Sequence, residues 1–381
     1  MDRKTVDFGC FVTLNNRMQE AALRIIDAAL NRAGEGLRVV EDYVRFVLDD
    51  PFLTRQTKTL RHELGEAAAM IPATDRHAAR DTTADVGTQI STASEGRRGD
   101  AGDVCAASFK RTEQALRSLE EYGKLEEFDK LTDADFAGRC EAIRYRLYTL
   151  EKAVDIGRVS REQLDGVRLC VLVDGRDSAA DFERLVRELV EAGVGMIQLR
   201  DKHIDDRELV ARARQFRELT RDTRSLAVIN DRADVAAVAG ADGVHLGQED
   251  LSVKEARAIV GTRMLVGVST HNIEQARAAV LDGANYLGAG PTFPSQTKAF
   301  DDLAGLEYLR EIAAEIRLPT FAIGGITADN LPDVLATGIT RIAVGAAVTE
   351  AGQPGVAVRK LLVMLNTPTA EAVSPVLTSN L

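Results

Sequence analysis

The chain has 381 residues, a length that suits two domains of about 150 residues each. Hydrophobic residues make up 45% of it and charged residues 28%, as is usual for a water-soluble globular protein. The formal net charge of −11 argues against a nucleic-acid partner, because binding to nucleic-acid phosphates requires clustered lysine and arginine. Small anionic substrates remain possible, since they need only a local basic pocket.

Neither a membrane nor a disulfide framework is expected. No stretch approaches the roughly 20 consecutive apolar residues that cross a bilayer, and the first residues lack the apolar segment of a secretory signal. We therefore expect a cytoplasmic protein. The four cysteines form no CxxC pair and the five histidines show no ligand spacing, which argues against a zinc site as well.

The apolar residues follow a helical period up to about residue 155. Over residues 20–48 they recur at steps of three and four, which predicts one buried helix face made of Leu30, Ala33, Leu37, Val40, Val44 and Val47. The same habit recurs over 52–70, 104–123 and 134–154, whereas the polar, glycine-rich stretch 81–103 predicts a long loop. Residues 1–155 are thus predicted to form an all-α domain.

Two helical segments of this domain are similar to each other. At a fixed offset, five residues of the first segment match five of the second: Arg32, Leu37, Arg38, Glu41 and Tyr43 match Arg111, Leu116, Arg117, Glu120 and Tyr122. Such self-similarity indicates two related helices, arranged around a pseudo-twofold axis. Chance similarity between two amphipathic helices is the alternative.

The pattern changes near residue 160. Eight short apolar runs then alternate with amphipathic helical segments, at 168–175, 196–201, 226–231, 243–247, 265–270, 286–292, 320–325 and 341–347. Apolar strands that alternate with helices predict a parallel sheet covered on both faces, and eight such units predict a closed barrel. The expected fold class is therefore α/β, with a (β/α)8 TIM barrel over residues 156–365 after the all-α domain. Residues 366–381 are predicted to be a disordered tail.

Active sites of such barrels lie at the C-terminal ends of the strands. Alternation at the second strand directs Gln198, Arg200 and Lys202 to one side, where two cations favour an anionic ligand. Pairing of these cations with barrel carboxylates is the alternative. Asp231 and Asp250 follow the third and fourth strands, and such carboxylates hold Mg²⁺ together with substrate phosphates. Capping of the following helices is the other interpretation of these aspartates.

The later strand ends carry further candidates for an anion site. Ser269 lies at the end of the fifth strand, where it would donate to a phosphate or cap the next helix. A polar loop follows the sixth strand, and its Ser295, Thr297 and Lys298 are expected to contact an anion. A solvated loop is the alternative. The glycines at 324, 325 and 345 let a phosphate approach backbone N–H groups. His245 lies mid-strand, and we interpret it as a packed structural residue rather than a base.

At this point the motifs resemble a known family. The segments QLRDK, INDRADVA, GADGVHLGQEDL, GVSTHN, GPTFPSQTK, AIGGIT and AVGAA are similar, in order and spacing, to those of thiamine-phosphate synthase, over about 200 residues. The resemblance implies a transferase that joins hydroxymethylpyrimidine diphosphate to thiazole phosphate and releases pyrophosphate. It implies a dissociative mechanism with Mg²⁺ as cofactor and no protein nucleophile.

The resemblance also implies roles for individual residues. The pyrimidine diphosphate would be contacted by Gln198, Leu199, Arg200, Asp201, Lys202, Asn230, Ser269 and Lys298. Asp231 and Asp250 would hold Mg²⁺, and Arg200 and Lys298 would act catalytically by neutralising the departing pyrophosphate. Thiazole phosphate would be contacted by Ser295, Gln296, Thr297, Gly325, Val344 and Gly345. Many family members carry Thr at position 295 and Ser at position 345, so at Gly345 only a backbone contact is expected.

The helical half resembles a domain found fused to this synthase, through DAALNRAGEGLRVVEDYVRFVL, RDTTADVGT and FKRTEQALRSLEEYGK. That domain is linked with a short monofunctional hydroxymethylpyrimidine phosphate kinase, which implies ATP as a further ligand. No GxxxxGK[ST] loop is present. A polar stripe could line a site or be a solvated, helix-pairing face: Asn31, Glu35, Arg38 and Asp42, with Arg80 and Asp81. A scaffold or dimerisation role is the alternative, and a homo-oligomer stays open.

Two other functions remain open for the barrel. A thiazole tautomerase-type isomerase shares the fold and one phosphate site but does not need the Mg²⁺ pair, so Asp231, Asp250 and Lys298 argue against it. A non-catalytic protein that binds thiamine precursors, with the helical half as scaffold, would bind ligand without turnover.

Overall fold

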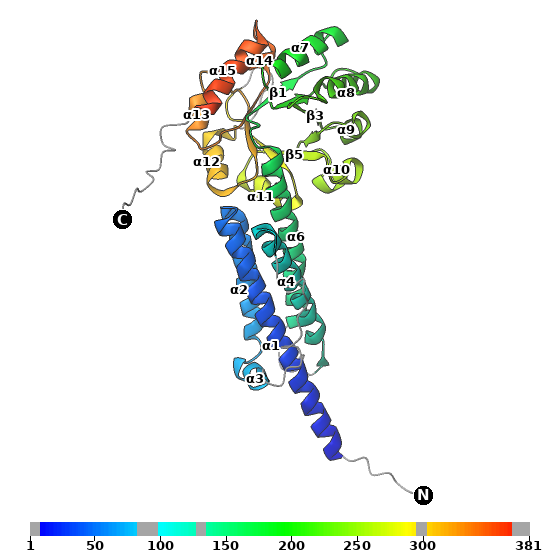
Figure 1. The fold of residues 1–381 in the computed structure, drawn as a ribbon, viewed down its shortest axis with the longest axis vertical. Helices are drawn as coiled ribbons and strands as arrows, with labels where there is room; N and C mark the ends of the chain where they lie inside the picture. Colours follow the sequence, from blue (N-terminus) through cyan, green and yellow to red (C-terminus); the bar gives the residue numbers. More distant parts are fainter. Residues whose placement is uncertain (1–7, 82–97, 127–134, 295–302, 368–381) are drawn as a thin grey trace, which may run out of the picture. The chain divides into compact units, whose positions relative to one another are not determined.

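The computed structural model describes residues 8–81, 98–126, 135–294 and 303–367, with side chains from residue 19 onward (Figure 1). The chain divides into two compact units, Met1–Val154 and Asp155–Leu381, and the division falls inside the long helix α6 (Phe136–Gln163). Within the described ranges, none of the helices is both long and apolar enough to span a bilayer.

The first unit is helical, as predicted. It contains α1 (Phe8–Phe46), α2 (Pro51–Ala69), α3 (Ala73–Ala78), α4 (Ala101–Gly123) and the first part of α6, and α1 packs against α2, α3 and α4. Local chemistry sets the helix starts. Asp50 accepts a hydrogen bond from the Leu53 N–H in front of α2, and Asp100 accepts one from Asp103 in front of α4. Because α4 begins at Ala101, the predicted loop 81–103 is wrong in its last three residues; its centre, 82–97, lies outside the described residues.

The predicted core face of the first helix is confirmed at all positions except one. Leu30, Ala33, Leu37, Val40 and Val44 are at most 5% exposed, whereas Val47 is 57% exposed. The helix ends at Phe46 and the chain then turns, so Leu48 rather than Val47 reaches the core. Helices α1 and α4 approach closely at Gly36, where a Cβ atom would lie 2.2 Å from Thr112 Oγ1.

The two similar segments lie on α1 and α4 and make equivalent contacts. Glu41 is buried and forms an ion pair with Arg61 of α2 at 2.8 Å, and Glu120 is buried and forms one with Arg144 of α6 at 2.6 Å. Each glutamate is also paired with an arginine three residues before it on its own helix. Two unrelated amphipathic helices have no reason to share a buried carboxylate with the same kind of partner, so this supports an internal repeat.

The second unit is a closed parallel barrel in the strand order β1-β2-β3-β4-β5-β6-β7-β8, with β8 paired to β1. The predicted TIM barrel is therefore confirmed. The strands are β1 (Leu169–Val173), β2 (Met196–Leu199), β3 (Leu226–Asn230), β4 (Gly243–Leu246), β5 (Leu265–Thr270), β6 (Tyr286–Ala289), β7 (Thr320–Ile323) and β8 (Ile342–Val344). The helices are α7 (Ala179–Glu191), α8 (Asp206–Thr220), α9 (Ala233–Ala239), α10 (Val253–Val260), α11 (Ile273–Asp282), α12 (Gly305–Glu315), α13 (Leu331–Leu335), α14 (Ala346–Thr349) and α15 (Pro354–Asn366).

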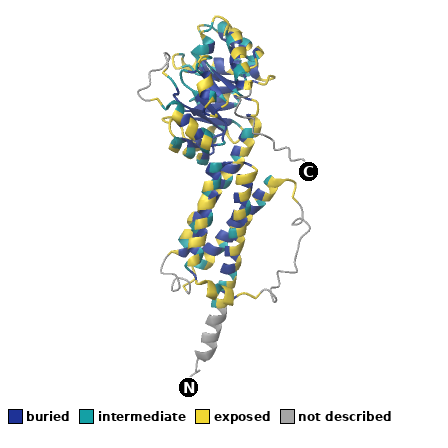
Figure 2. Cartoon of the chain, turned by 90° about the vertical axis from the view of Figure 1, so that its left-hand side faces the viewer, coloured by how far each residue is buried: buried dark blue, intermediate teal, exposed yellow. Residues whose placement is uncertain are grey.

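Buried side chains fill the barrel interior. The strands of the barrel are coloured mostly as buried in Figure 2. One apolar cluster contains Cys170, Met196, Val228, Tyr286 and Phe321, contributed by five different strands. Because side chains alternate along a strand, the residue two positions further along each strand also points inward, one layer closer to the C-terminal ends. This second layer carries the polar candidates. The predicted tail begins inside α15, and residues 368–381 lie outside the described part of the chain.

Candidate active site

The end of β2 contributes one inward and one outward side chain. Gln198 lies two residues after the core residue Met196, so its side chain points to the same face of β2, the barrel interior. It is 4% exposed. The Leu199 side chain points to the opposite face of β2, toward the surrounding helices, and is 1% exposed. A contact from Leu199 to a ligand in the barrel would therefore come from its backbone.

The two cations that follow differ in their surroundings. Lys202 Nζ lies 3.3 Å from Asp231 Oδ2, with the lysine side chain 60% exposed. Arg200 is held by its backbone, whose N–H donates to Val173 O at 2.8 Å. Its guanidinium makes no hydrogen bond or ion pair with any other residue that the structure describes. Pairing with a barrel carboxylate, the alternative stated above, thus holds for Lys202 but not, within the described ranges, for Arg200.

Asp201 organises the loops at this edge of the barrel. Its carboxylate accepts hydrogen bonds from the N–H groups of Gly175, His203 and Ile204, at 2.9, 2.7 and 3.2 Å. Burial would raise the pKa of Asp201, but these three backbone donors outweigh it and lower the pKa. The side chain therefore joins the β1–α7 and β2–α8 loops, and its predicted contact with substrate stays a prediction.

Asp231 and Asp250 lie at the ends of adjacent strands, and neither caps a helix. The N-cap of α9 is Arg232 and that of α10 is Ser252, which forms a capping box with Glu255. The capping interpretation of these two aspartates is therefore wrong. Asp231 instead has a positive φ of 60°, a conformation that costs a non-glycine residue energy and that recurs at functional sites.

The two carboxylates lie within hydrogen-bonding reach of each other. Burial raises the pKa of Asp231, and the hydrogen bond and negative charge of Asp250 raise it further, while Lys202 opposes the shift. One oxygen of Asp250 also accepts the Gly247 N–H at 2.6 Å. Two facing carboxylates that repel each other favour a bound cation. No group of three or more ligating side chains occurs among the described residues, so water or substrate oxygens would complete such a site.

Ser269 belongs to a hydrogen-bonded row inside the barrel. Its Oγ lies 2.9 Å from His245 Nε2, and His245 Nδ1 lies 3.2 Å from the Tyr286 hydroxyl. The cap of α11 is Asn272, so the capping interpretation of Ser269 is wrong. Burial lowers the pKa of His245 to about 4, which keeps the imidazole neutral at physiological pH and agrees with a packed structural residue rather than a base.

The glycines after β7 and β8 lie in different surroundings. Gly325 has a φ of +62°, and a Cβ atom there would lie 2.4 Å from Pro294 O, so the adjoining backbone already requires a glycine. Among the described residues other than its chain neighbours, the atom nearest to a Cβ at Gly345 would be Leu172 Cβ, at 4.0 Å. Val344 is 3% exposed and alternates with the inward Ala343. Within the part of the chain that the structure describes, an approach to backbone N–H groups is thus open at Gly345.

The remaining barrel candidates fall in a segment that the structure leaves undescribed. Ser295, Gln296, Thr297 and Lys298 lie outside the described residues.

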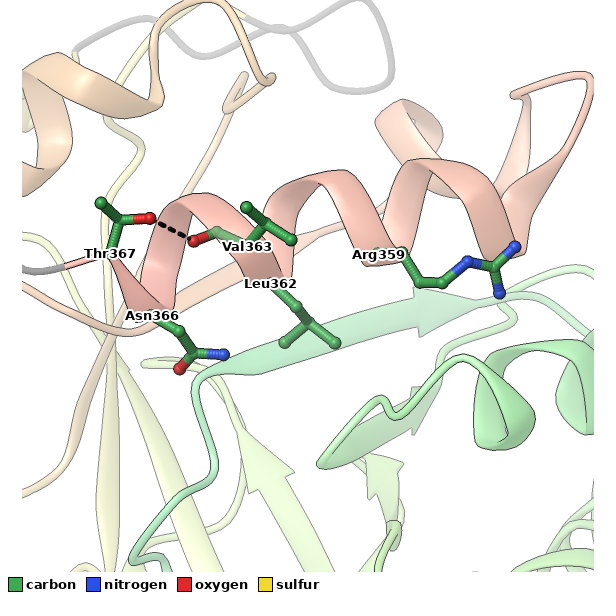
Figure 3. Close-up of a pocket in the computed structure, with 5 residues that line it drawn as sticks. All are labelled: Arg359, Leu362, Val363, Asn366 and Thr367. Atoms are coloured by element: carbon green, nitrogen blue, oxygen red, sulfur yellow. Dashed lines mark hydrogen bonds between the residues drawn. The ribbon is translucent and has the colours of Figure 1, made fainter.

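A surface hollow of about 500 Å³ belongs to a different part of the barrel unit (Figure 3). It is lined by residues of α15 and the turn after it, Arg359, Leu362, Val363, Asn366 and Thr367, and by none of the predicted site residues.

Comparison with known proteins identifies the family of the chain. A family model described as thiamine monophosphate synthase matches residues 169–348, and one described as the ThiD2 family matches residues 24–153. A thiamine-phosphate synthase of Rhodopirellula baltica is 44% identical over 340 residues, which cover 87% of this chain and 89% of the relative. One of Synechocystis sp. is 39% identical and covers 91% and 97%.

The chain belongs to the thiamine-phosphate synthase family. This is a family of transferases, as the sequence motifs predicted. A ThiD2-type helical region precedes the barrel in the sequence. Among solved structures, a thiamine phosphate pyrophosphorylase from Pyrococcus furiosus is 36% identical and covers 53% of this chain and 98% of its own, with a TM-score of 0.47.

The polar stripe of α1 lies on the surface of the ThiD2-type region. Asn31, Glu35, Arg38 and Asp42 are all exposed. Arg80 instead forms a bidentate ion pair with the buried Asp27, at 2.5 and 3.1 Å. Asp27 thereby ties the chain that follows α3 to α1. Asn31 of the stripe donates to the same Asp27 oxygen as Arg80, at 3.3 Å, so Arg80 lies next to one end of the stripe. The exposure of the four stripe residues agrees with a solvated face.

The sequence analysis did not identify Tyr286 as a site residue, although two glycines inside neighbouring strands indicate a bulky side chain there. Gly267 and Gly288 lie in the interiors of β5 and β6, where glycine often marks a close approach. A Cβ atom at Gly267 would lie 2.1 Å from the Tyr286 ring, and one at Gly288 would lie 3.1 Å from His245 Cε1. The two strand glycines therefore make room for two rings inside the barrel.

Proposed function

We propose that the barrel joins the pyrimidinylmethyl group of hydroxymethylpyrimidine diphosphate to the ring nitrogen of thiazole phosphate. The bond between the methylene carbon and the diphosphate oxygen breaks, and its electron pair leaves with pyrophosphate. The resulting pyrimidinylmethyl cation is stabilised by its electron-rich ring, and the thiazole nitrogen adds to it to give thiamine phosphate. The observation that carries this proposal is the pair of facing carboxylates, Asp231 and Asp250, beside the cations of the β2 end.

The diphosphate would bind between the ends of β2, β3 and β5. The guanidinium of Arg200, which has no described partner, and the exposed ammonium of Lys202 supply positive charge, and Asn230 and Ser269 supply polar side chains at the neighbouring strand ends. Positive groups placed where charge develops stabilise a transition state more than a ground state. Lys298 is proposed to add a second cation, and Gln198 faces the pyrimidine from the barrel interior.

Asp231 and Asp250 fit Mg²⁺, and we propose this ion as the cofactor. Mg²⁺ is typically held by one or two carboxylates together with substrate phosphates and water, which agrees with two described carboxylates and no third ligating side chain. When bound, the ion would supply charge neutralisation for the departing pyrophosphate. The proximity of the two carboxylates would position it, and binding would relieve the repulsion between them.

Thiazole phosphate would bind at the ends of β7 and β8. The support is the space that the described residues leave around Gly345, at the start of α14. The N–H groups of Val348 and Thr349 donate to Gly345 O, so those of Ala346 and Ala347 are the ones that could face a phosphate. Contacts from Gly325, Val344 and the segment with Ser295, Gln296 and Thr297 are part of the same proposal. Gly325 and Val344 would contribute backbone groups, because space at the first is taken by Pro294 and the second is buried.

For the helical region, we propose phosphorylation of hydroxymethylpyrimidine phosphate by ATP, which would supply the substrate that the barrel consumes. The match of residues 24–153 to the ThiD2 family supports it. A scaffold or dimerisation role is the second candidate, which the solvated polar stripe of α1 favours. The protein is proposed to work in the cytoplasm, where these phosphorylated precursors would be available, and a homo-oligomer remains an open assembly state.

Full-length protein tests both activities. With Mg²⁺, hydroxymethylpyrimidine diphosphate and thiazole phosphate it should release pyrophosphate and form thiamine phosphate. Absence of both products from folded protein would leave the precursor-binding alternative, and conversion of the thiazole alone between tautomers would favour the isomerase. With ATP and hydroxymethylpyrimidine phosphate, an Asp231→Asn variant should still form ADP and the diphosphate. If no ADP forms, the scaffold role is supported instead.

A further inference from the structure

We propose that His245 and Tyr286 are positioning residues that fix the direction of the Ser269 hydroxyl, so that its hydrogen points at the diphosphate in the barrel mouth. The inference rests on the proposed function, since it takes Ser269 as a contact of the diphosphate. It assigns a role in the reaction to the side chains of these two residues. The backbone oxygen of His245 accepts the Asp231 N–H at 2.8 Å, whereas its side chain bonds to Ser269 and Tyr286. Their effect is transmitted through hydrogen bonds that the structure shows.

The direction of the first hydrogen bond follows from burial. Tyr286 is 3% exposed, and within the described ranges its hydroxyl has a single hydrogen-bond partner, His245 Nδ1 at 3.2 Å. Burial raises the pKa of Tyr286 well above its ordinary value, so the phenol keeps its proton. A buried hydroxyl hydrogen requires an acceptor. Tyr286 therefore donates and His245 Nδ1 accepts.

The second hydrogen bond follows from the first. A neutral imidazole carries one donor and one acceptor nitrogen, so once Nδ1 accepts, the proton of His245 is on Nε2. Nε2 then donates to Ser269 Oγ at 2.9 Å. This uses a lone pair of the serine oxygen and leaves its own hydrogen free. With one side of the hydroxyl occupied by His245, the hydrogen is directed to the C-terminal end of β5, where Ser269 is partly exposed.

The packing around the row restricts the two rings. The His245 and Tyr286 ring centroids lie 5.5 Å apart, and Phe321 packs edge-on to Tyr286 at 5.7 Å. A Cβ at Gly288 would lie 3.3 Å from His245 Nε2. The strand end is anchored as well, because Gln248 Nε2 donates to the backbone oxygen of Ser269 at 2.5 Å. The hydroxyl is thus preorganised before a ligand arrives, which is the condition under which a donor stabilises developing charge best.

A double-mutant cycle tests the coupling. The variants are Ser269→Ala, His245→Leu and the double variant, each assayed for kcat and for KM of hydroxymethylpyrimidine diphosphate. Removing one preorganised donor lowers kcat by about 100-fold, so we expect Ser269→Ala to lose about that factor. His245→Leu should lower kcat by at least about 10-fold, and the double variant should be no slower than Ser269→Ala alone. If His245→Leu lowers kcat by the same factor in wild type and in Ser269→Ala, the proposal is overturned.

Two further measurements separate positioning from structure. His245→Gln keeps an N–H near the place of Nε2, so it should recover most of the kcat that His245→Leu loses; failure to recover it in folded protein argues against the proposal. If the leucine variant does not fold, ¹⁵N NMR of the wild-type imidazole decides, because a proton on Nε2 supports the proposal and one on Nδ1 rejects it.

Failure of the inference is distinguishable from failure of the proposed function. If wild-type protein forms no thiamine phosphate, the synthase function itself is rejected. If wild-type protein is active and Ser269→Ala retains full kcat and KM, the reaction stands and the role of the hydroxyl is rejected.

Discussion

Lys202 Nζ and Asp231 Oδ2, from the ends of neighbouring strands, lie 3.3 Å apart. The lysine thus partly neutralises one half of a carboxylate pair whose other half is Asp250. A divalent cation at the pair would compete with this ammonium, and the released lysine would be free to contact a phosphate. The same side chain therefore opposes metal binding in the free protein and supports diphosphate binding in the complex.

Lys202→Gln tests this double role. An ion pair of which one partner is 60% exposed contributes at most about 1 kcal/mol, so Mg²⁺ should bind the substrate-free variant up to about fivefold more tightly than wild type. KM for the diphosphate should rise at the same time, because a cation has been removed from its site. Calorimetric titration with Mg²⁺ and steady-state kinetics measure the two effects. Weaker Mg²⁺ binding by the variant would contradict the competition.

Asp231→Asn and Asp250→Asn test the metal site. Each should lower Mg²⁺-dependent kcat by at least about 100-fold, because the neutral amide holds the cation poorly and leaves the departing charge uncompensated. Glu249→Gln is the matched control, since it removes the same charge from an exposed position beside Asp250 and should keep wild-type kcat. Recovery of turnover at high Mg²⁺ would indicate weakened binding, whereas turnover near wild type without added Mg²⁺ would count against the site.

His245 predicts a pH dependence of stability. Its pKa is lowered from 6.5 to about 4 by burial, so the folded state binds fewer protons than the unfolded state between these values. The stabilisation is complete above pH 6.5 and is lost as the pH falls to 4, by up to about 3 kcal/mol.

His245→Gln provides the comparison, because other groups also titrate in this range. Denaturant unfolding of both proteins from pH 7.5 to 4 should show a smaller loss of unfolding free energy for the glutamine variant. Parallel curves for the two proteins would mean that His245 is protonated equally in the folded and unfolded states.

In the helical unit, Arg144→Met should destabilise the fold, because it leaves the carboxylate of Glu120 buried with two exposed partners, Arg117 and Lys124. We expect a loss of roughly 2 kcal/mol, less than for a buried charge with no partner at all. The double variant Arg144→Met with Glu120→Leu should recover most of it, since no buried charge remains. Thermal unfolding measures both, and a double variant as unstable as the single one would rule out the buried charge as the cause.

The sequence alone determined the class of fold and the order of its elements. Helical periods before residue 155 and eight apolar runs after it were sufficient, because periodicity reports which face of an element is buried. The motifs around Arg200, Asp231 and Ser269 also determined the family. These are local properties, carried by residues close together in the chain.

Only the tertiary structure decided what each candidate side chain contacts. Asp201 and Asp250 are both acids after a strand, yet Asp201 accepts three backbone N–H groups while Asp250 faces Asp231. The row from Tyr286 to Ser269 joins three strands, and the exposure of Val47 depends on where α1 ends. Such pairings depend on the register and closure of the barrel and on helix termini, which bring together residues far apart in the chain and which no local pattern specifies.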